Sequence, residues 1–406
     1  MKKIPKGLRM ILMIGCCGAL TIFSSTISKS PILPIFAKSL GADGAQIGWI
    51  ASASTVPGIL ISYVAGDLAD RFGYRKIMIG SLLVFSSAPF LYLLVQTPLE
   101  LGAVRFYHGF ATAAFGPVAM AVVAAFSPKD HTGQNLSLYS SATLVGRALA
   151  PAAGGVLYQF GGYSFVYLTA GAAALIALAS AAWFFRRSED EKNAAPVRPG
   201  DGGGEKVPFF RKLWGVLSYR PLFFVGMLDA CSYFAYGAFE MIFPLYAEQL
   251  GMSKTEIGLL LGMQLVGMIL FKPLFGRASD RLGRLPMMIA GLLTCTLAFF
   301  LLAVLRSVFA MIPLILVYGL GFALITASTS ALAADVARAG QLGASLGILS
   351  TLMDVGQTFG PPAIGAVSDL CGYNGGIGML GILFLLAAAG CVAAFLKQRK
   401  ADRIRK

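Results

Sequence analysis

Charged residues are scarce in this sequence. Only 13% of its 406 residues are Asp, Glu, Lys or Arg, whereas soluble domains carry about 25%. Hydrophobic residues make up 57% of the chain, and its mean hydropathy is +0.74. The shortage of charge excludes an ordinary soluble domain and indicates a protein whose main solvent is lipid.

The sequence patterns of common enzymes and cofactor sites are also missing. The chain has no nucleophile elbow, no phosphate-binding loop and no HExxH motif, so we expect neither an enzyme nor direct use of ATP. Its six cysteines lie almost entirely in apolar runs and without metal-ligand spacing, which predicts small packing residues and no metal site. These cysteines are Cys16, Cys17, Cys231, Cys295, Cys371 and Cys391. We therefore expect no cofactor.

Apolar runs long enough to cross a bilayer recur along the chain. Each span needs about 20 such residues, and twelve runs meet that requirement. The first follows a basic segment, as in a signal peptide, but it is too long and lacks an early cleavage site, so we expect an uncleaved helix. The predicted spans are 10–37, 45–66, 76–96, 100–123, 136–158, 164–186, 221–247, 255–275, 285–305, 309–334, 343–367 and 375–396.

Lys and Arg are distributed unequally between alternate loops. With the N-terminus in the cytoplasm, 26 of the 33 basic residues fall in cytoplasmic segments, three in external loops and four within spans. This bias predicts cytoplasmic termini in a cell membrane, and we expect a bacterial inner membrane. It also explains the net charge of +14 without a nucleic-acid partner.

A charged segment rich in Gly and Pro, 187–208, divides the chain into two halves that repeat. Adding 210 to a residue number in the first half gives its partner in the second, as with Gly109 and Gly319. Parallel repeats of this kind place the substrate route between them. We predict an N-terminal six-helix bundle at 1–186, a cytoplasmic linker with a short amphipathic segment at 187–220, and a C-terminal six-helix bundle with a basic tail at 221–406.

A pattern of Gly, Asp and Arg occurs once in each half, after the second and the eighth predicted spans. It comprises Gly66, Asp70, Arg71, Gly73 and Arg75 in the first copy and Gly276, Asp280, Arg281 and Gly283 in the second. The pattern resembles the cytoplasmic signature loop of the major facilitator superfamily. The resemblance implies an all-α membrane protein with 12 transmembrane helices in two pseudo-symmetric six-helix bundles, and a loop that acts as a cytoplasmic latch. Simple anchoring by positive charge is the alternative.

A second match lies in the fourth predicted span, where Arg105 and His108 stand in an apolar run. It is similar to the superfamily's helix-4 motif, in which the Arg is implicated in proton coupling, but His108 replaces the usual Gln. An intramembrane Arg costs several kcal/mol unless it is paired or hydrated. His108 could titrate near neutral pH or donate a hydrogen bond, and we favour the hydrogen bond.

A third match lies in the fifth predicted span and is echoed in the eleventh. Its residues are Gly146, Pro151, Gly154 and Gly155, with Gly356, Gly360, Pro361 and Gly365 in the second half. The first set looks like the helix-5 motif of drug:proton antiporters, with Ala150 in place of a Gly. This resemblance favours efflux over uptake. The alternative is that small residues with Pro are common packing devices in membranes.

Six ionisable residues within the spans are candidates for transport because buried charges in membranes are costly. Lys29, Arg105 and Arg147 are cations in the first half, whereas Asp229, Glu240 and Asp354 are acids in the second. We hypothesise that Lys29 and Glu240 pair across the outer half of the membrane and separate when it opens.

The seventh span presents Asp229, Tyr233, Tyr236 and Glu240 on one helical face, with the two carboxylates about 16 Å apart. This face suits the wall of a cavity for a lipophilic or cationic substrate. A polar strip in the first span could face it, comprising Ser24, Ser25 and Ser28. Ordinary hydrogen bonding between helices is the alternative.

These features predict a monomeric, proton-coupled exporter of small lipophilic or cationic compounds that works by alternating access. Its expected partners are the substrate, protons and membrane lipids, and the proton gradient supplies the energy. A carboxylate held away from water binds a proton more readily, and Asp354 is our first candidate for this role, before Asp229. An uptake symporter, or a carrier of organic anions or metabolites, is the alternative, and a sensor that does not transport is a third class.

Overall fold

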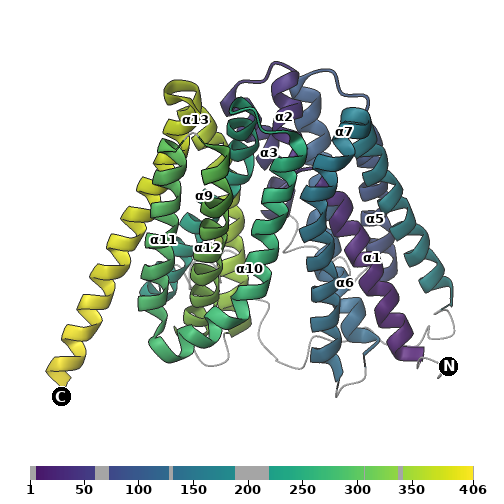
Figure 1. Ribbon diagram of the computed structural model, residues 1–406. Helices are drawn as coiled ribbons and strands as arrows, with labels where there is room; N and C mark the ends of the chain where they lie inside the picture. Colours follow the sequence, from purple (N-terminus) through teal and green to yellow (C-terminus); the bar gives the residue numbers. More distant parts are fainter. Residues whose placement is uncertain are drawn as a thin grey trace. The chain divides into compact units, whose positions relative to one another are not determined.

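A computed structural model of the chain is helical throughout, and it contains no strand among the residues it describes, 6–59, 73–127, 131–187, 219–305, 307–336 and 342–405. The chain divides into two compact units (Figure 1). The first unit consists of Met1–Gly41 and Ala53–Lys206, and the second of Ala42–Ser52 and Val207–Lys406. A short segment of the N-terminal half therefore belongs to the second unit.

The described residues of the first unit form five helical elements. These are α1 (Lys6–Ile27), α2 (Ile32–Ser39), α5 (Tyr74–Tyr92), α6 (Pro98–Ala125) and α7 (Thr132–Arg187). The expected continuous helix over 10–37 is interrupted, because the chain leaves helical geometry after Ile27 and re-enters it at Ile32. Pro31 has no N–H to donate to the preceding turn, which ends α1 there. The expected break between 158 and 164 is present, with Gly162 at φ 61° inside α7.

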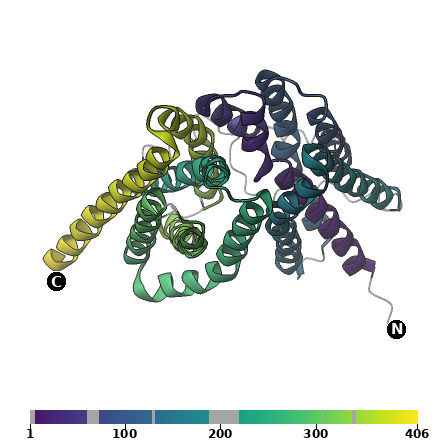
Figure 2. The same ribbon diagram turned by 45° about the horizontal axis from the view of Figure 1, so that its top comes forward.

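Six helical elements are formed by those residues of the second unit that the structure describes. These are α3 (Gly44–Ser52), α9 (Arg220–Gln249), α10 (Lys254–Leu282), α11 (Arg284–Val304), α12 (Val308–Val336) and α13 (Leu342–Arg405). Within α13 the chain bends at Gly372, where φ is 72°. The first part of α13 packs along α9. In the tilted view of Figure 2, α13 begins in yellow-green and α9 is teal.

Eight helical stretches of the described residues are long enough and apolar enough to cross a membrane. They are Leu12–Ser39, Pro98–Ala125, Thr132–Arg186, Arg220–Gln249, Lys254–Leu282, Arg284–Val304, Val308–Val336 and Leu349–Lys397. Two of these stretches contain the glycine breaks of α7 and α13, so each holds two helices. The total of twelve spans stays a prediction.

The sequence repeat is visible in the backbone. Three pairs of glycines at the 210-residue offset take the left-handed conformation at matching turns, with φ of 86° and 87°, 88° and 96°, and 61° and 72°. The pairs are Gly41 and Gly251, Gly73 and Gly283, and Gly162 and Gly372. A close helix contact repeats as well, since Gly109 packs on the Ser54 carbonyl and Gly319 on that of Gln264. The two halves therefore share local geometry as well as sequence.

The second predicted span departs from its repeat partner. Helix α3 ends at Ser52, and Ala53–Thr55 form a turn before the helix resumes at Val56. The equivalent residues 263–265 lie inside the uninterrupted helix α10. The expected helix over 45–66 is thus broken near its middle, and its residues 60–66 lie outside the described part of the chain.

Helix α13 approaches α9 closely enough that small residues at the contact are required. A side chain at Gly356 would overlap the Ala230 carbonyl, and one at Gly360 would overlap the Phe234 carbonyl. Such contacts hold membrane helices together by van der Waals packing. We therefore expect Gly356→Ala to destabilise the protein by about 1–3 kcal/mol. A thermal unfolding assay in detergent would measure this as a lower melting temperature.

Gly267→Ala in α10 is the matched control for this prediction. Nothing lies within 4 Å of the position its new methyl group would take, so we expect stability to be unchanged or raised by about 0.5–1 kcal/mol. Equal melting temperatures for the two variants would contradict the close contact between α13 and α9.

Candidate functional site

One face of α9 carries two acids and packs on α12 within the second unit. Asp229 is 4% exposed, and its Oδ1 accepts a hydrogen bond from Thr329 Oγ1 at 2.9 Å. The second acid is Glu240. Tyr236 precedes it by one helical turn, and the Tyr236 hydroxyl donates a hydrogen bond to Glu240 Oε1 at 2.8 Å. On this face Glu240 therefore meets Tyr236 of its own helix, whereas Asp229 meets Thr329 of α12.

Three aromatic rings lie between these acids. Tyr233 and Tyr236 contact each other edge-on with ring centroids 6.2 Å apart. Phe322 of α12 joins both, 5.4 Å from Tyr233 and 4.9 Å from Tyr236, where the rings stack. The result is an aromatic wall with a carboxylate at its edge, which we call the α9 wall (Tyr233, Tyr236, Glu240 and Phe322).

Sequence reasoning did not connect Asp229 with a cation of its own half. Lys272 of α10 acts electrostatically on Asp229, and charges interact over longer distances in a low-dielectric surround. The expected division, with membrane cations in the first half and acids in the second, is therefore incomplete. The sequence contained a sign of this cation, because Lys272 lies inside a predicted span, as do Lys29, Arg105 and Arg147.

Asp354 has a different environment in α13. It is half-buried, and Thr358 Oγ1 donates to its backbone carbonyl at 2.7 Å. Within the part of the chain that the structure describes, its carboxylate has neither a hydrogen-bond nor an ion-pair partner. Of the two acids considered as proton carriers, Asp354 is the one that no side chain among the described residues holds.

A buried polar cluster lies within the first unit, around Arg105. This side chain is 2% exposed and donates to the hydroxyls of Ser54 and Tyr92. His108 is 1% exposed, and its Nδ1 is 3.2 Å from the Tyr92 hydroxyl. Tyr92 also stacks on Tyr167, with ring centroids 4.7 Å apart. The favoured hydrogen-bonding role of His108 thus has a partner, Tyr92.

Several polar atoms of this cluster are unsatisfied. Arg105 Nε, His108 Nε2 and the Tyr167 hydroxyl are buried and have no hydrogen-bond partner among the residues that the structure describes. No carboxylate pairs with Arg105 among the described residues. A buried guanidinium without an anion is costly in a membrane, which makes Arg105 a candidate functional residue.

The remaining cavity candidates of the first half are dispersed. The Ser28 hydroxyl donates to the Ser24 carbonyl of its own helix at 2.8 Å, whereas Ser25 and Lys29 are half-buried. Arg147 is exposed on α7. These residues belong to the first unit and the α9 wall to the second, so their meeting across a cavity stays a prediction.

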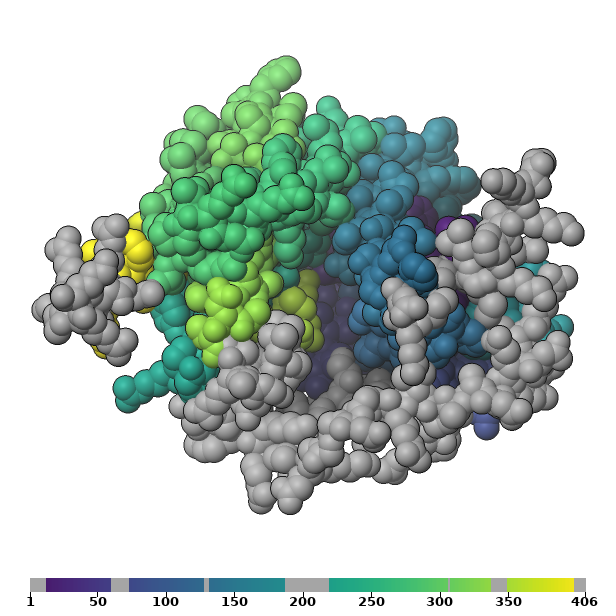
Figure 3. All heavy atoms as spheres, turned by 90° about the horizontal axis from the view of Figure 1, so that it is seen from below, coloured from purple at the N-terminus to yellow at the C-terminus, as the bar shows by residue number. Residues whose placement is uncertain are grey.

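The second copy of the Gly-Asp-Arg pattern has a clear ion-pair network at the end of α10. Arg284 contacts the Asp280 carboxylate and donates through Nε to Asp335 Oδ2 of α12 at 2.9 Å. Figure 3 looks onto this end, where green atoms of the α10 and α11 region lie at the surface. The pairing residue is Arg284 rather than Arg281, and the sequence pattern did not reveal Asp335 as its partner.

Other members of this pattern have turn or surface positions. Gly283 takes φ 96° between α10 and α11, and Gly73 takes φ 88° before α5. Gly276 is half-buried, whereas Arg75 and Arg281 are exposed. Gly66, Asp70 and Arg71 lie outside the described residues.

The glycines of the predicted helix-5 and helix-11 motifs make close helix contacts. Gly146 packs on the Ala19 carbonyl of α1, Gly154 lies near Ile27, and Gly365 packs on the Gly44 carbonyl of α3. Gly155 is buried, and Pro151 and Pro361 lie within their helices. These contacts support the packing interpretation of the motif, whatever its part in transport.

Comparison with known proteins defines the class. The sequence profile of the Major Facilitator Superfamily matches residues 14–253 and 225–406. Multidrug resistance protein 2 of Bacillus subtilis is 24% identical over 343 residues, covering 84% of each chain. An uncharacterized MFS-type transporter of Methanocaldococcus jannaschii is 23% identical over 350 residues, covering 84% of this chain and 87% of that protein.

A solved structure of similar fold is the nucleoside transporter NupG in its D323A form. It superposes with a TM-score of 0.80 at 13% identity and covers 95% of this chain and 100% of that one. The chain belongs to the Major Facilitator Superfamily. It is a multi-pass membrane transporter and not an enzyme.

Proposed function

We propose that the protein exports small lipophilic or cationic compounds in exchange for protons. Two six-helix bundles, 1–186 and 221–406, alternate access to a substrate route between them and give twelve spans in all. Membership of the superfamily, the 210-residue repeat and the similarity to a multidrug resistance protein support this proposal. The protein acts as a monomer in a bacterial inner membrane, with both termini in the cytoplasm.

The α9 wall is the observation that carries the proposed substrate class. Aromatic faces attract cations, and Glu240 adds a negative charge at the edge of three contacting rings. An apolar surface with few polar groups suits compounds of varied shape. A flat organic cation would stack on the rings and place its charge near Glu240.

Proton coupling is assigned to the acids of the second half. Asp354 is the first candidate because no side chain in the described part of the chain holds its carboxylate, and Asp229 follows. Protonation and binding of a cation compete for the same negative charge, which links the two flows. Arg105 is placed in the coupling machinery, and the separation of Lys29 from Glu240 accompanies opening of the outer half.

Dye accumulation tests this function directly. We expect cells that contain the protein to accumulate less of a lipophilic cationic dye than cells without it, and a protonophore to remove the difference. The reason is that export against a gradient requires the proton gradient when no nucleotide is used. Proteoliposomes with an imposed pH gradient provide the cell-free control. Accumulation that is equal with and without the protein, over a panel of dyes, would contradict export.

Uptake of an anion is the second candidate, and one observation favours it. Arg105 is buried without a carboxylate partner among the described residues, and Arg147 is exposed on the same unit. A carboxylate or phosphate substrate would supply the missing negative charge. Symport predicts accumulation of substrate with alkalinisation of the medium, whereas a sensor would show neither export nor uptake.

A further inference from the structure

One hydroxyl, that of Tyr92 in α5, connects Arg105 and His108 of α6. Arg105 Nη1 lies 3.5 Å from the Tyr92 oxygen, and His108 Nδ1 lies 3.2 Å from it. A guanidinium can only donate hydrogen bonds, so the Tyr92 oxygen accepts from Arg105. The hydroxyl proton of Tyr92 is then left for His108, whose Nδ1 accepts it. The three side chains therefore form a chain of hydrogen bonds that runs from Arg105 through Tyr92 to His108.

The surroundings of His108 favour a neutral ring. Arg105 already places one positive charge in the cluster, and no carboxylate of the described residues forms a hydrogen bond or an ion pair with either side chain. His108 is 1% exposed, so a second positive charge there would be buried beside the first without an anion, which is costly. A neutral imidazole that accepts at Nδ1 has its proton on Nε2. The hydrogen-bond direction thus selects one form of His108.

Aromatic contacts fix the two rings of this chain. Tyr92 is 1% exposed, and it stacks on Tyr167 of α7 with ring centroids 4.7 Å apart. Phe85 of α5 contacts the His108 ring edge-on, with centroids 5.2 Å apart. Neither ring can turn away from its partner without losing this packing. The Tyr92 hydroxyl is therefore placed by ring contacts that do not depend on the hydroxyl itself.

The second half of the protein repeats the fold without this chain. Residues at the 210-residue offset remove its charge and its central hydroxyl: Leu302 for Tyr92, Ile315 for Arg105, Tyr318 for His108 and Ile377 for Tyr167. Leu302, Ile315 and Ile377 are completely buried. A buried Arg is costly, and the repeat shows that apolar residues can fill these positions. The fold therefore does not require the chain, which points to a role in function.

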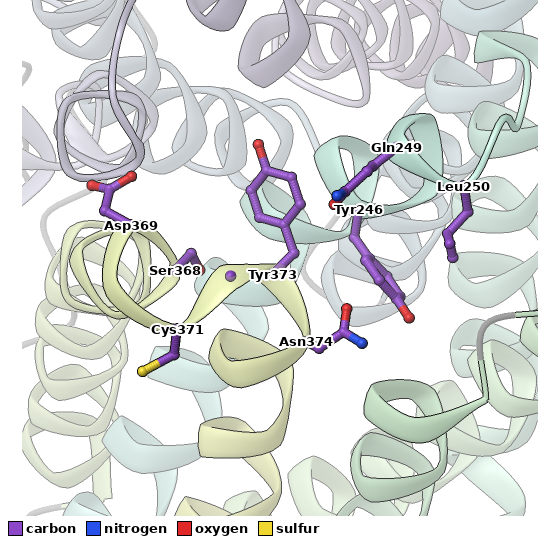
Figure 4. A pocket seen from close by; sticks show the side chains of 9 residues that line it. Tyr246, Gln249, Leu250, Ser368, Asp369, Cys371, Tyr373 and Asn374 are labelled. Carbon is purple, nitrogen blue, oxygen red and sulfur yellow. The ribbon is translucent and has the colours of Figure 1, made fainter.

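Polar side chains beside Leu302 serve the backbone instead. The Tyr246 hydroxyl and the Asn374 amide donate to the carbonyls of Leu302 and Ala303 at 3.1 and 3.0 Å. Both side chains line a cavity of about 510 Å³, as Figure 4 shows. They satisfy carbonyl groups at the end of α11, and neither side chain has a charge. Among the described residues, the second half thus has no counterpart of the chain around Arg105.

We propose that Tyr92 is a positioning residue, which holds the Arg105 guanidinium and is itself held by a neutral His108. A hydroxyl and a neutral imidazole orient the guanidinium without cancelling its charge, whereas a carboxylate would do both. Arg105 therefore keeps its full positive charge for a negative group that it meets during the coupling step. This inference rests on the coupling role proposed for Arg105 above.

The protonated nitrogen of His108 tests the chain without a transport assay. The sequence has two histidines, His108 and His131, so the full-length protein labelled with ¹⁵N- and ¹³C-histidine gives two sets of ring signals in solid-state NMR in lipid bilayers. His131→Gln identifies the set that belongs to His108. We expect one neutral form of His108, with its proton on Nε2. In Tyr92→Phe the Nδ1 signal should shift, because its donor is lost, and the form protonated on Nδ1 should appear.

Dye export measures the consequence for Arg105. In Tyr92→Phe one hydrogen bond to a charged group is lost, while the ring stack and the α9 wall are kept. We expect the maximal rate of proton-driven export to fall about tenfold and KM to stay the same. His108→Gln should lose less of this rate than His108→Leu, because the amide oxygen of Gln can accept from the Tyr92 hydroxyl.

Tyr167→Phe is the matched control for Tyr92→Phe. It removes a hydroxyl from the other ring of the same stack, and that hydroxyl has no hydrogen-bond partner in the described part of the chain. We expect it to leave both the export rate and the His108 signals unchanged. Equal losses of rate in the two variants would assign the effect to packing and overturn the proposal.

The remaining outcomes separate the positioning role from the export. A His108 ring protonated on Nδ1, or on both nitrogens, in the unmodified protein would overturn the proposal. An unchanged export rate in Tyr92→Phe would overturn it as well. A protein that exports no dye, but shows the expected form of His108 and its change in Tyr92→Phe, would support the chain and refute only the export.

Discussion

Asp354→Asn is expected to abolish proton-driven export while leaving exchange of bound substrate intact. Asparagine resembles the protonated carboxyl in shape and charge, so the substrate can still enter and leave the site. It cannot release a proton, and the step that links the proton gradient to transport is lost. Because no described side chain holds the Asp354 carboxylate, its replacement should not disturb folding.

Transport into proteoliposomes measures both parts of this expectation. With an imposed pH gradient, uphill transport by the variant should fall to the level of empty vesicles. Without a gradient, counterflow of labelled substrate should continue at a rate near that of the unmodified protein. Asp229→Asn serves for comparison. That carboxylate accepts a hydrogen bond from Thr329 and interacts electrostatically with Lys272, so we expect the substitution to displace neighbouring side chains and to weaken both activities. Uphill transport retained in Asp354→Asn would remove this residue from the coupling step.

Glu240→Gln is expected to weaken the transport of cationic compounds and to spare neutral ones. In the unmodified protein the Tyr236 hydroxyl is 2.8 Å from Glu240 Oε1. The substitution keeps an acceptor oxygen for this hydroxyl but removes the negative charge at the edge of the α9 wall. We expect KM for a monovalent lipophilic cation to rise about tenfold, equivalent to about 1.4 kcal/mol. A neutral dye of similar size should keep its KM, and Tyr236→Phe, which retains the ring, is the matched control.

The same residue allows a test of the hypothesised pair with Lys29. Lys29→Glu should impair export, and adding Glu240→Lys should restore part of it, because the swap preserves one charge of each sign. Failure of the double variant to improve on Lys29→Glu would count against the pair. An equal rise in KM for neutral and cationic dyes in Glu240→Gln would count against Glu240 as the site of charge recognition.

The sequence was sufficient to place the α9 residues of the candidate site on one helix face. It was not sufficient to identify the residues of other helices that contact them. Helical spacing put Asp229, Tyr233, Tyr236 and Glu240 on one face of α9, and their contacts with each other and with α12 agree with it. Phe322 and Thr329 join them from about 90 to 100 residues away along the chain, and spacing within one helix contains no information about such neighbours. Lys272 could have been noticed as a cation within a predicted span, although its electrostatic interaction with Asp229 could not.

The ion pairs at the helix ends show the same division. The duplicated pattern marked the turn after α10, because a left-handed turn favours glycine and Gly283 occupies one at φ 96°. It did not select Arg284 over Arg281 as the pairing arginine, since Asp335 comes from the far end of α12. Side-chain pairing depends on which helix ends lie together, and that is decided by packing.

By itself, the sequence determined that this is a helical membrane protein and that its two halves are repeats of each other. Lipid imposes these features locally, because each span must satisfy its own backbone and carry about 20 apolar residues. Only the tertiary structure decided that residues 42–52 join the second unit and that Arg105 is buried among Ser54, Tyr92 and His108. Those outcomes depend on close contacts between distant segments, where one glycine or one carboxylate decides which surfaces can meet.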